Sequence, residues 1–203
     1  MVVDRATLFA DGYFQGFAAA DKMDYKSIIN DQYYYTKRGP AEEQPALKQP
    51  IAYCIIIHKE TGDVFAYQRA AKDTYTEERL RGKWSWGIGG HIDKIDAEGE
   101  DDPIIASLMR ELDEEVYIDG HDTPRILGYI NDDETPVGQV HFGLLFLIPT
   151  DSRNVKPRDA EIAWGGFKSV KELQEILESP EASVETWSEI GLAPLREYLD
   201  QNL

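Results

Sequence analysis

The sequence predicts an α/β (α+β) fold in which a mixed β-sheet is sandwiched between helices. Four apolar runs rich in β-branched and aromatic residues predict the strands, at 51–58, 64–70, 126–130 and 140–148. Helical patterns begin after Asp102 and return at 170–177 and 184–199, the last interrupted near Gly191 and Pro194. Strands in the middle of a chain, with helices around them, are typical of a layered domain built from a sheet and helices.

The first fifty residues are expected to form an N-terminal extension, 1–50, packed on a main domain, 51–203. Segments 4–12 and 24–30 each begin with an aspartate and predict short helices. Segment 36–50 is rich in proline and glycine and predicts a connecting loop. The first two strands are separated by Thr61-Gly62-Asp63, which predicts an antiparallel hairpin.

The charge of the chain limits the kinds of partner it can have. The 203 residues carry a formal net charge of −17, while hydrophobic residues at 42% can furnish a core. Such a surface repels nucleic acid and anionic membranes, so neither is expected as a partner. An acidic protein can still bind a polyphosphate when divalent cations bridge its carboxylates to the phosphate oxygens. A small anionic substrate therefore implies a metal ion.

The cysteine content and the N-terminal segment predict a cytoplasmic protein. Cys54 is the single cysteine, so no intrachain disulfide can form, and the apolar run around it predicts a buried, inert thiol. The chain start lacks a basic segment followed by an apolar stretch, and no apolar run reaches the length of a membrane span. A homodimer is left open.

The helix after Asp102 combines an apolar stripe with a cluster of carboxylates. Asp102 can cap free N–H groups, and Pro103 suits the first helical position. At about 100° per residue, one apolar face predicted to be buried is formed by Ile105, Leu108, Met109, Leu112 and Val116. A second arc beside it contains Glu111, Glu114 and Glu115.

Helix physics disfavours this acidic cluster unless a cation binds to it. Neighbouring like charges repel, and anions near a helix C-terminus oppose the macrodipole. A bound Mg²⁺ or Mn²⁺ reverses that effect, because both ions prefer carboxylate oxygens. A solvated acidic face is the alternative interpretation. Upstream, the strand-like run 82–91 contains Gly89 and Gly90, which predict a sharp turn and close approach of a ligand.

These residues resemble the signature of the Nudix (MutT-like) hydrolases. The signature consists of glycine, five residues, glutamate, seven residues and then an Arg-Glu-apolar-x-Glu-Glu helix, and the chain has Gly90 followed by Arg110-Glu111-Leu112-Asp113-Glu114-Glu115. The Gly-Gly-His-Ile run and the long N-terminal extension resemble the predicted phosphoesterases of that family. The resemblance implies an enzyme that hydrolyses a phosphoanhydride bond in a nucleoside diphosphate derivative or a similar organic pyrophosphate.

The chain departs from the signature in three places. Asp102 is separated from Arg110 by seven residues and takes the acidic position, with Glu100 as its competitor. Eleven residues instead of five then separate Gly90 from Asp102, so an enlarged loop is expected at 91–101. The last two departures are Tyr117, where the signature has the helix-ending glycine, and Ile88, which replaces a common proline.

The resemblance also implies roles for individual residues. Glu111, Glu114 and Glu115 would hold the metal, Mg²⁺ or alternatively Mn²⁺, while Arg110 would orient a glutamate through a charge-assisted hydrogen bond. The proton of the attacking water would go to a box glutamate such as Glu114 or to Glu161 in a later loop, and a plain surface acid is the alternative for Glu161.

The expected substrate contacts are Arg69, at the end of the second strand of the hairpin, and the glycine pair Gly89 and Gly90. Arg69 matches a position where the family often has a phosphate-contacting arginine, although balancing local acids is the alternative. His91 and His141 could be ligands, but an ordinary hydrogen-bonded role is the favoured interpretation for both.

Two other function classes compete with hydrolysis. A diphosphate isomerase shares the fold but needs a catalytic cysteine, and Cys54 lies within an apolar strand, which argues against that class. A non-catalytic nucleotide-binding module is the second alternative, and the intact carboxylates argue against it.

Overall fold

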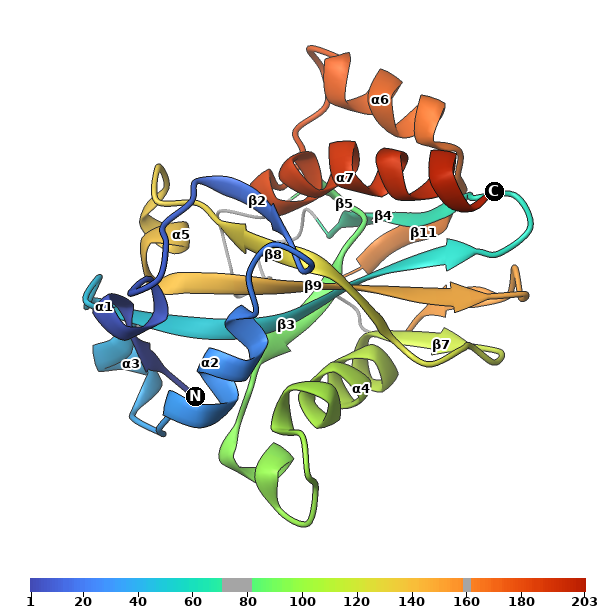
Figure 1. Ribbon diagram of the computed structural model, residues 1–203. Coiled ribbons are helices and arrows are strands. Elements are labelled where there is room, and N and C mark those ends of the chain that lie inside the picture. The colour runs from blue at the N-terminus through green and yellow to red at the C-terminus, as the bar shows by residue number, and fades with distance from the viewer. Residues whose placement is uncertain (71–81, 159–161) are drawn as a thin grey trace. The chain divides into compact units, whose positions relative to one another are not determined.

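The computed structural model describes residues 1–70, 82–158 and 162–203 (Figure 1). It has a mixed α+β fold with a large sheet, which confirms the predicted fold class. The helices are α1 (Arg5–Leu8), α2 (Tyr25–Gln32), α3 (Arg38–Ala41), α4 (Pro103–Glu115), α5 (Pro136–Val140), α6 (Val170–Glu178), α7 (Thr186–Asn202) and the 3₁₀ turn η2 (Lys94–Ala97).

The large sheet contains nine strands within the described ranges, with the order β11-β4-β3-β9-β8-β2 along its main path. β1 and β6 pair with β3, and β5 pairs with β4, off this path. Its strands are β1 (Val3–Asp4), β2 (Gly16–Ala19), β3 (Leu47–His58), β4 (Val64–Arg69), β5 (Trp84–Ser85), β6 (Ile88–His91), β8 (Arg125–Asn131), β9 (His141–Thr150) and β11 (Ile162–Lys168). A separate ribbon pairs β7 (Val116–Ile118) antiparallel with β10 (Val155–Pro157).

The chain divides into two compact units, and the long strands β3 and β9 contribute to both. The first unit consists of residues 1–53, 89–110 and 126–146. The second consists of residues 54–88, 111–125 and 147–203. The expected division at residue 50 between an extension and a main domain stays a prediction.

In the second unit the predicted hairpin is confirmed, since β3 and β4 pair antiparallel with Ile57 opposite Val64. Helices α6 and α7 lie next to each other in Figure 1. The predicted interruption of the last helix is wrong, because α7 runs through Gly191 and Pro194. Leu192, Leu195 and Leu199 bury one face of α7, and this packing outweighs the hydrogen bond that Pro194 cannot donate.

In the first unit the predicted short helices appear as α1 and α2, and Asp24 caps α2 by accepting a hydrogen bond from the Ser27 N–H. The predicted loop 36–50 is wrong in part, because it contains α3 and the first residues of β3. β1 pairs with those residues, matching Val3 with Lys48. Within the described chain, no helix is long and apolar enough to cross a membrane.

Lys48 places a charged group in the core of the first unit. Its side chain is fully buried, and its Nζ donates to Asp133 Oδ1 at 2.8 Å, to the Gly138 carbonyl at 2.6 Å and to the His141 carbonyl at 3.1 Å. These three acceptors match the three hydrogens of an ammonium group. Asp133 also pairs with Arg5 and accepts from the Tyr13 hydroxyl at 2.9 Å. This network fixes the segment between β8 and β9 near the start of β3.

Replacing Asp133 with asparagine is expected to lower the free energy of unfolding by roughly 3–5 kcal/mol, because Lys48 would stay buried without its counter-ion. Urea-induced unfolding at neutral pH measures the loss. Burial alone would raise the pKa of Asp133, but hydrogen bonds from Arg5 and Lys48 hold that pKa well below its usual range. The wild-type stabilisation is therefore present above the unfolded-state pKa and is lost as the pH falls toward the folded-state pKa.

The control is Asp122→Asn, because Asp122 pairs with Lys59 on the surface at 3.0 Å. Removing this exposed partner is expected to cost less than about 1 kcal/mol. Equal losses in the two variants would contradict the assigned role of the buried network.

Candidate active site on helix α4

Helix α4 begins where the sequence predicts. Asp102 Oδ1 accepts hydrogen bonds from the backbone N–H groups of Ile104 at 3.1 Å and Ile105 at 3.4 Å, and Pro103 takes the first helical position. The other carboxylate oxygen of Asp102 pairs with Lys26. Asp102 is therefore the cap of the helix, and its two oxygens are already engaged.

The buried face of α4 is rotated from the predicted one. Ile104, Leu108 and Leu112 are buried, as is Val116 directly after the helix, whereas Ile105 and Met109 are only half-buried. Ser107 explains the rotation: it is fully buried, and its hydroxyl donates to the His91 carbonyl at 3.3 Å. The buried arc thus extends toward the polar Ser107 and away from Ile105.

This rotation changes the environment of the carboxylates. At about 100° per residue, Glu111 and Glu115 fall on the same arc as Ile104 and Leu108, rather than beside it. Glu111 and Glu115 are accordingly half-buried, and Glu114 is exposed. The Oε2 atom of Glu115 is itself shielded from solvent. Carboxylates in such positions must be balanced by donors or by a cation.

Cys54, on β3, lies close enough to Glu115 for the carboxylate charge to affect its thiol. The thiol is fully buried, and its pKa is raised well above the usual range, first by burial and then by the charge of Glu115. A thiol held in its neutral form is a poor nucleophile. Cys54 is therefore inert, as predicted, and this argues further against the isomerase alternative.

The C-terminal end of α4 is held by Arg158 rather than by a glycine turn. The N–H of Arg158 donates to the Glu115 carbonyl at 2.8 Å, and its guanidinium donates to the carbonyl and the carboxylate of Asp113, each at 2.8 Å. A cation at this end also interacts favourably with the helix dipole. The chain then continues directly into β7, so Tyr117 needs no turn and lies exposed with Arg158 over its ring.

Arg110 binds an aspartate that sequence reasoning missed. Its Nε donates to Asp96 Oδ1 at 2.8 Å, and its Nη2 donates to Asp96 Oδ2 at 3.0 Å and to the His91 carbonyl at 3.1 Å. Asp96 lies in η2 and is buried, with 3% of its side chain exposed. Burial alone would raise its pKa, but Arg110 and the N–H of Asp93 more than offset that effect and lower it.

Asp102, the acid predicted to take the acidic position of the signature, caps α4, whereas Asp96 is the acid that binds the guanidinium of Arg110. Five residues separate Gly90 from Asp96, which is the spacing of the signature, so this spacing is the sequence signal for Asp96. The extra residues lie between Asp96 and Arg110, where thirteen residues, 97–109, stand in place of seven. The predicted loop 91–101 accordingly contains η2 as well as irregular chain.

Gly89 and Gly90 do not form the predicted sharp turn, since both lie within strand β6. The requirement for glycine at position 89 is instead a close approach of backbone. A Cβ atom added to Gly89 would lie 2.0 Å from the Ala52 carbonyl oxygen, so any larger residue would clash with the backbone of β3. Their contact with a substrate stays a prediction.

Arg69, at the end of β4, belongs to a buried network in the second unit. Its Nε pairs with Glu185 Oε1 at 2.9 Å, and only 11% of the arginine side chain is exposed. The Ser85 hydroxyl donates to the other oxygen of Glu185 at 2.9 Å. The structure thus gives Arg69 a role in joining β4 to the start of α7, and its predicted contact with substrate is untested. Glu161 lies outside the described residues.

His91 and His141 come together in the first unit. Their Nε2 atoms are 3.1 Å apart, and their rings meet edge to face with centroids 5.1 Å apart. Burial, followed by the charges of Arg38 and His141, lowers the pKa of His91 to about 3. Burial also lowers the pKa of His141, against the opposing effect of its hydrogen bond to the Val137 carbonyl. Both imidazoles are therefore neutral at physiological pH.

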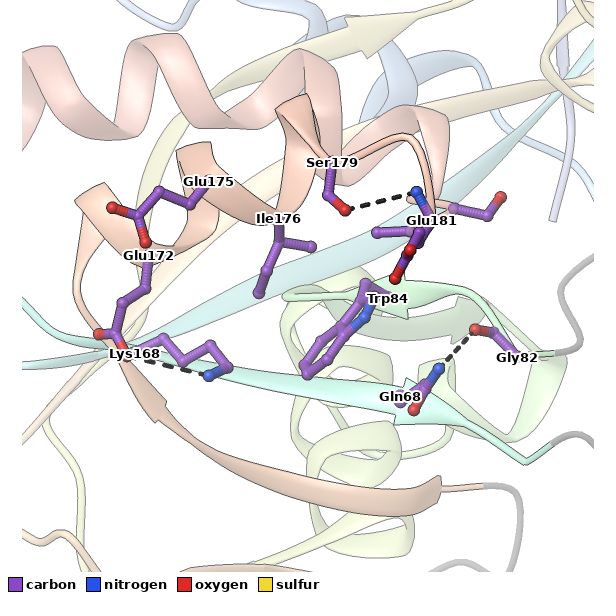
Figure 2. A pocket seen from close by; sticks show the side chains of 11 residues that line it. Gln68, Gly82, Trp84, Lys168, Glu172, Glu175, Ile176, Ser179 and Glu181 are labelled. Atoms are coloured by element: carbon purple, nitrogen blue, oxygen red, sulfur yellow. Dashed lines mark hydrogen bonds and ion pairs between the residues drawn. The ribbon is translucent and has the colours of Figure 1, made fainter.

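A groove of about 450 Å³ lies in the second unit, between α6 and strands β4, β5 and β11 (Figure 2). Trp84 lines it beside Lys168, whose Nζ lies 5.5 Å from the ring of Trp84 and 5.3 Å from the ring of Trp164. The α4 carboxylates do not belong to the lining of this groove. It is a separate feature of the surface.

The carboxylates of α4 can be tested as a metal site by the chemistry of their donors. Glu111, Glu114 and Glu115 supply hard oxygen ligands from one turn of a helix, and these suit a divalent cation such as Mg²⁺. Among the described residues, no three His, Cys, Asp or Glu side chains are already arranged to hold a metal ion. The three carboxylates are therefore the right type of ligand for a divalent cation. Their side chains, however, do not converge on one position in this structure.

The comparisons with known proteins agree with the signature. The family model of the NUDIX domain matches residues 48–199. Protein YmaB of Bacillus subtilis (strain 168) is 36% identical over 182 residues, which cover 87% of this chain and 85% of YmaB.

Two solved structures have a similar fold. Tm1382, provisionally assigned as a Nudix hydrolase, has a TM-score of 0.78 at 25% identity and covers 97% of each chain. The second is a bifunctional NMN adenylyltransferase/ADP ribose pyrophosphatase from Francisella tularensis, complexed with AMP and a manganese ion. It has a TM-score of 0.52 at 14% identity, and the match covers 74% of this chain and 42% of the Francisella chain. The matched family model and the extensive identity with YmaB establish that this chain belongs to the NUDIX domain family, whose hydrolases are enzymes acting on pyrophosphates.

Proposed function

We propose that this chain is a Mg²⁺-dependent hydrolase of a phosphoanhydride bond in a nucleoside diphosphate derivative or a similar organic pyrophosphate. The observation that carries the proposal is the position of Glu111 and Glu115 on the core-facing arc of α4, with Glu114 exposed beside them. Carboxylates in half-buried positions supply hard oxygen ligands that a divalent cation can bind. Nudix hydrolases generally use divalent metals, and the Francisella structure, which is similar in fold, contains manganese and AMP.

Glu111, Glu114 and Glu115 would hold the cation, with Mn²⁺ as an alternative to Mg²⁺. When bound, a divalent cation neutralises phosphate charge and makes a nearby water more acidic. Glu114 is the exposed carboxylate of the three, so solvent reaches it, and it is the best candidate within the described residues to accept the proton of that water. Glu161 is the alternative acceptor that the family resemblance implies.

Arg110 would act in this site by fixing the turn of α4 that carries the carboxylates. Its guanidinium holds both oxygens of Asp96 and the carbonyl of His91, so η2 and the end of β6 are tied to the helix. Planar bidentate pairs of this kind fix orientation as well as distance. Arg69, Gly89 and Gly90 are proposed as substrate contacts on the family resemblance alone.

The function is tested by a screen of nucleoside diphosphate derivatives with Mg²⁺, followed by the variant Glu114→Gln on the best substrate. We expect the variant to lose roughly a hundredfold or more in turnover, because a charged ligand of the cation is removed. Without metal its thermal stability should be equal or slightly higher, since repulsion among neighbouring carboxylates falls.

The matched control is Asp113→Asn, which removes the same charge from an exposed position one residue away. Its turnover should stay within a few-fold of the wild type. Near-normal turnover of Glu114→Gln would contradict the metal site and favour the interpretation of the cluster as a solvated acidic face. If no compound in the screen is cleaved, the result would favour a non-catalytic nucleotide-binding module.

A second pair of variants separates the roles of the two aspartates around α4. Asp96→Ala releases the guanidinium of Arg110 and is expected to lower turnover and apparent Mg²⁺ affinity by roughly 10–100-fold, as loss of a group that orients metal ligands does. Asp102→Ala removes a helix cap and is expected to cost about 1 kcal/mol of stability with little effect on turnover. Steady-state kinetics at varied Mg²⁺ and thermal unfolding measure both. The reverse pattern would return the acidic position of the signature to Asp102.

A further inference from the structure

We propose that His91 and His141 form a binding site for a first-row transition-metal cation such as Zn²⁺ or Co²⁺, separate in chemistry from the carboxylate site on α4. Their two Nε2 atoms are 3.1 Å apart. Tetrahedral Zn²⁺ binds imidazole nitrogen at about 2.0–2.1 Å, which places two ligating nitrogens about 3.3 Å from each other. The distance between the two Nε2 atoms is thus close to the distance between two ligands of one tetrahedral cation.

The tautomer of His141 is already the one that a metal ligand requires. Its Nδ1 is 2.7 Å from the Val137 carbonyl oxygen, so Nδ1 carries the proton and Nε2 carries the lone pair. Metal-bound histidines usually donate their second ring N–H to a carbonyl or carboxylate in this way. Lys48 holds the carbonyls of Gly138 and His141 itself, so the position of the ring is fixed by the buried network.

The backbone of His91 is held by hydrogen bonds, whereas its imidazole ring can change tautomer. Its carbonyl accepts hydrogen bonds from Arg110 Nη2 at 3.1 Å and Ser107 Oγ at 3.3 Å. Without metal, the Nε2–H of His91 can donate to His141. When a cation binds, that proton moves to Nδ1 of the same ring, and both Nε2 lone pairs face the cation. No proton is released by this change of tautomer, since both imidazoles are neutral.

Other groups are available to complete the coordination. The amide of Gln49 is buried, and its nitrogen lies 3.5 Å from His141 Nε2, so a rotation of the amide would present its oxygen at this position. Both rings are half-buried, which leaves access for water ligands. The surrounding charge is mainly positive, because Arg38 acts on both rings, the Met1 ammonium acts on His91 and Lys48 acts on His141, with Glu42 opposing them at His141. This charge weakens cation binding, so the site depends on direct coordination by the two imidazoles.

The donor type determines which cation is favoured. Imidazole suits Zn²⁺, Co²⁺ and Ni²⁺, whereas Mg²⁺ requires oxygen ligands. An excess of Mg²⁺ therefore occupies the carboxylates of α4 and leaves the histidine pair open. This contrast allows the two sites to be measured independently, and the histidine site does not depend on the proposed hydrolase activity.

The test is a titration of the metal-stripped full chain with Co²⁺ in excess Mg²⁺, followed by visible absorption, with Zn²⁺ as competitor. We expect one Co²⁺ to bind per chain and to give the intense visible absorption band of Co²⁺ with a low coordination number. Zn²⁺ should displace the Co²⁺ and abolish this band. His91→Ala and His141→Ala should each weaken Co²⁺ binding at least about tenfold. His121→Ala is the matched control, because His121 is exposed and bonded only locally, and it should bind normally.

Two further variants keep the test decisive. His91→Asn retains a polar side chain if the alanine variant does not fold, and thermal unfolding without metal establishes that each protein is intact. Glu114→Gln should leave Co²⁺ binding unchanged. Absence of a Co²⁺ band in the wild type, or equal Co²⁺ affinity in folded variants of either histidine, would overturn the site and leave an ordinary imidazole hydrogen bond.

Discussion

Glu111 and Glu115 occupy the core-facing arc at the end of α4, a position where a carboxylate is costly unless another charge balances it. The surrounding structure holds the helix in that orientation. Asp102 fixes the first turn, Arg158 binds the carbonyls of the last turn, and buried leucines fix the rotation of the helix about its axis. The helix therefore cannot turn its acids into solvent without breaking its own caps and core. A divalent cation bound there would stabilise this arrangement and make it chemically useful.

The ion pair between Arg110 and Asp96 connects this helix to the preceding segment. Asp96 is buried and caps η2, and Arg110 reaches it while also binding the carbonyl of His91. His91 then contacts His141, whose carbonyl is held by Lys48. A series of polar contacts thus runs through the first unit from Arg110 to the buried Lys48. Because each member is a charged or polar group inside the protein, loss of one leaves its neighbour without compensation.

Much of the fold was predictable from the sequence because the patterns responsible are local. Asp102-Pro103 marks the start of α4, and Thr61-Gly62-Asp63 marks the hairpin, within a few residues of chain. The misassigned features depend on contacts distant in sequence. Ser107 looks like a surface residue until the His91 carbonyl satisfies it, and Arg158 caps a helix that ends 43 residues earlier, at Glu115. Pro194 breaks an isolated helix, but the packing of α7 overrides it. Asp96 has the spacing of the signature from Gly90, whereas Asp102 has that spacing from Arg110, so the sequence alone is consistent with either acid.

The central claim is that the carboxylates of α4 hold the catalytic cation, and it is tested most directly by Mn²⁺-induced broadening of backbone amide resonances. In the isotope-labelled full chain, the account predicts that substoichiometric Mn²⁺ broadens the amides of residues 111–115 first, and that excess Mg²⁺ restores them. Selective broadening elsewhere, with the amides of 111–115 unaffected, would contradict the assignment of the metal site to this helix.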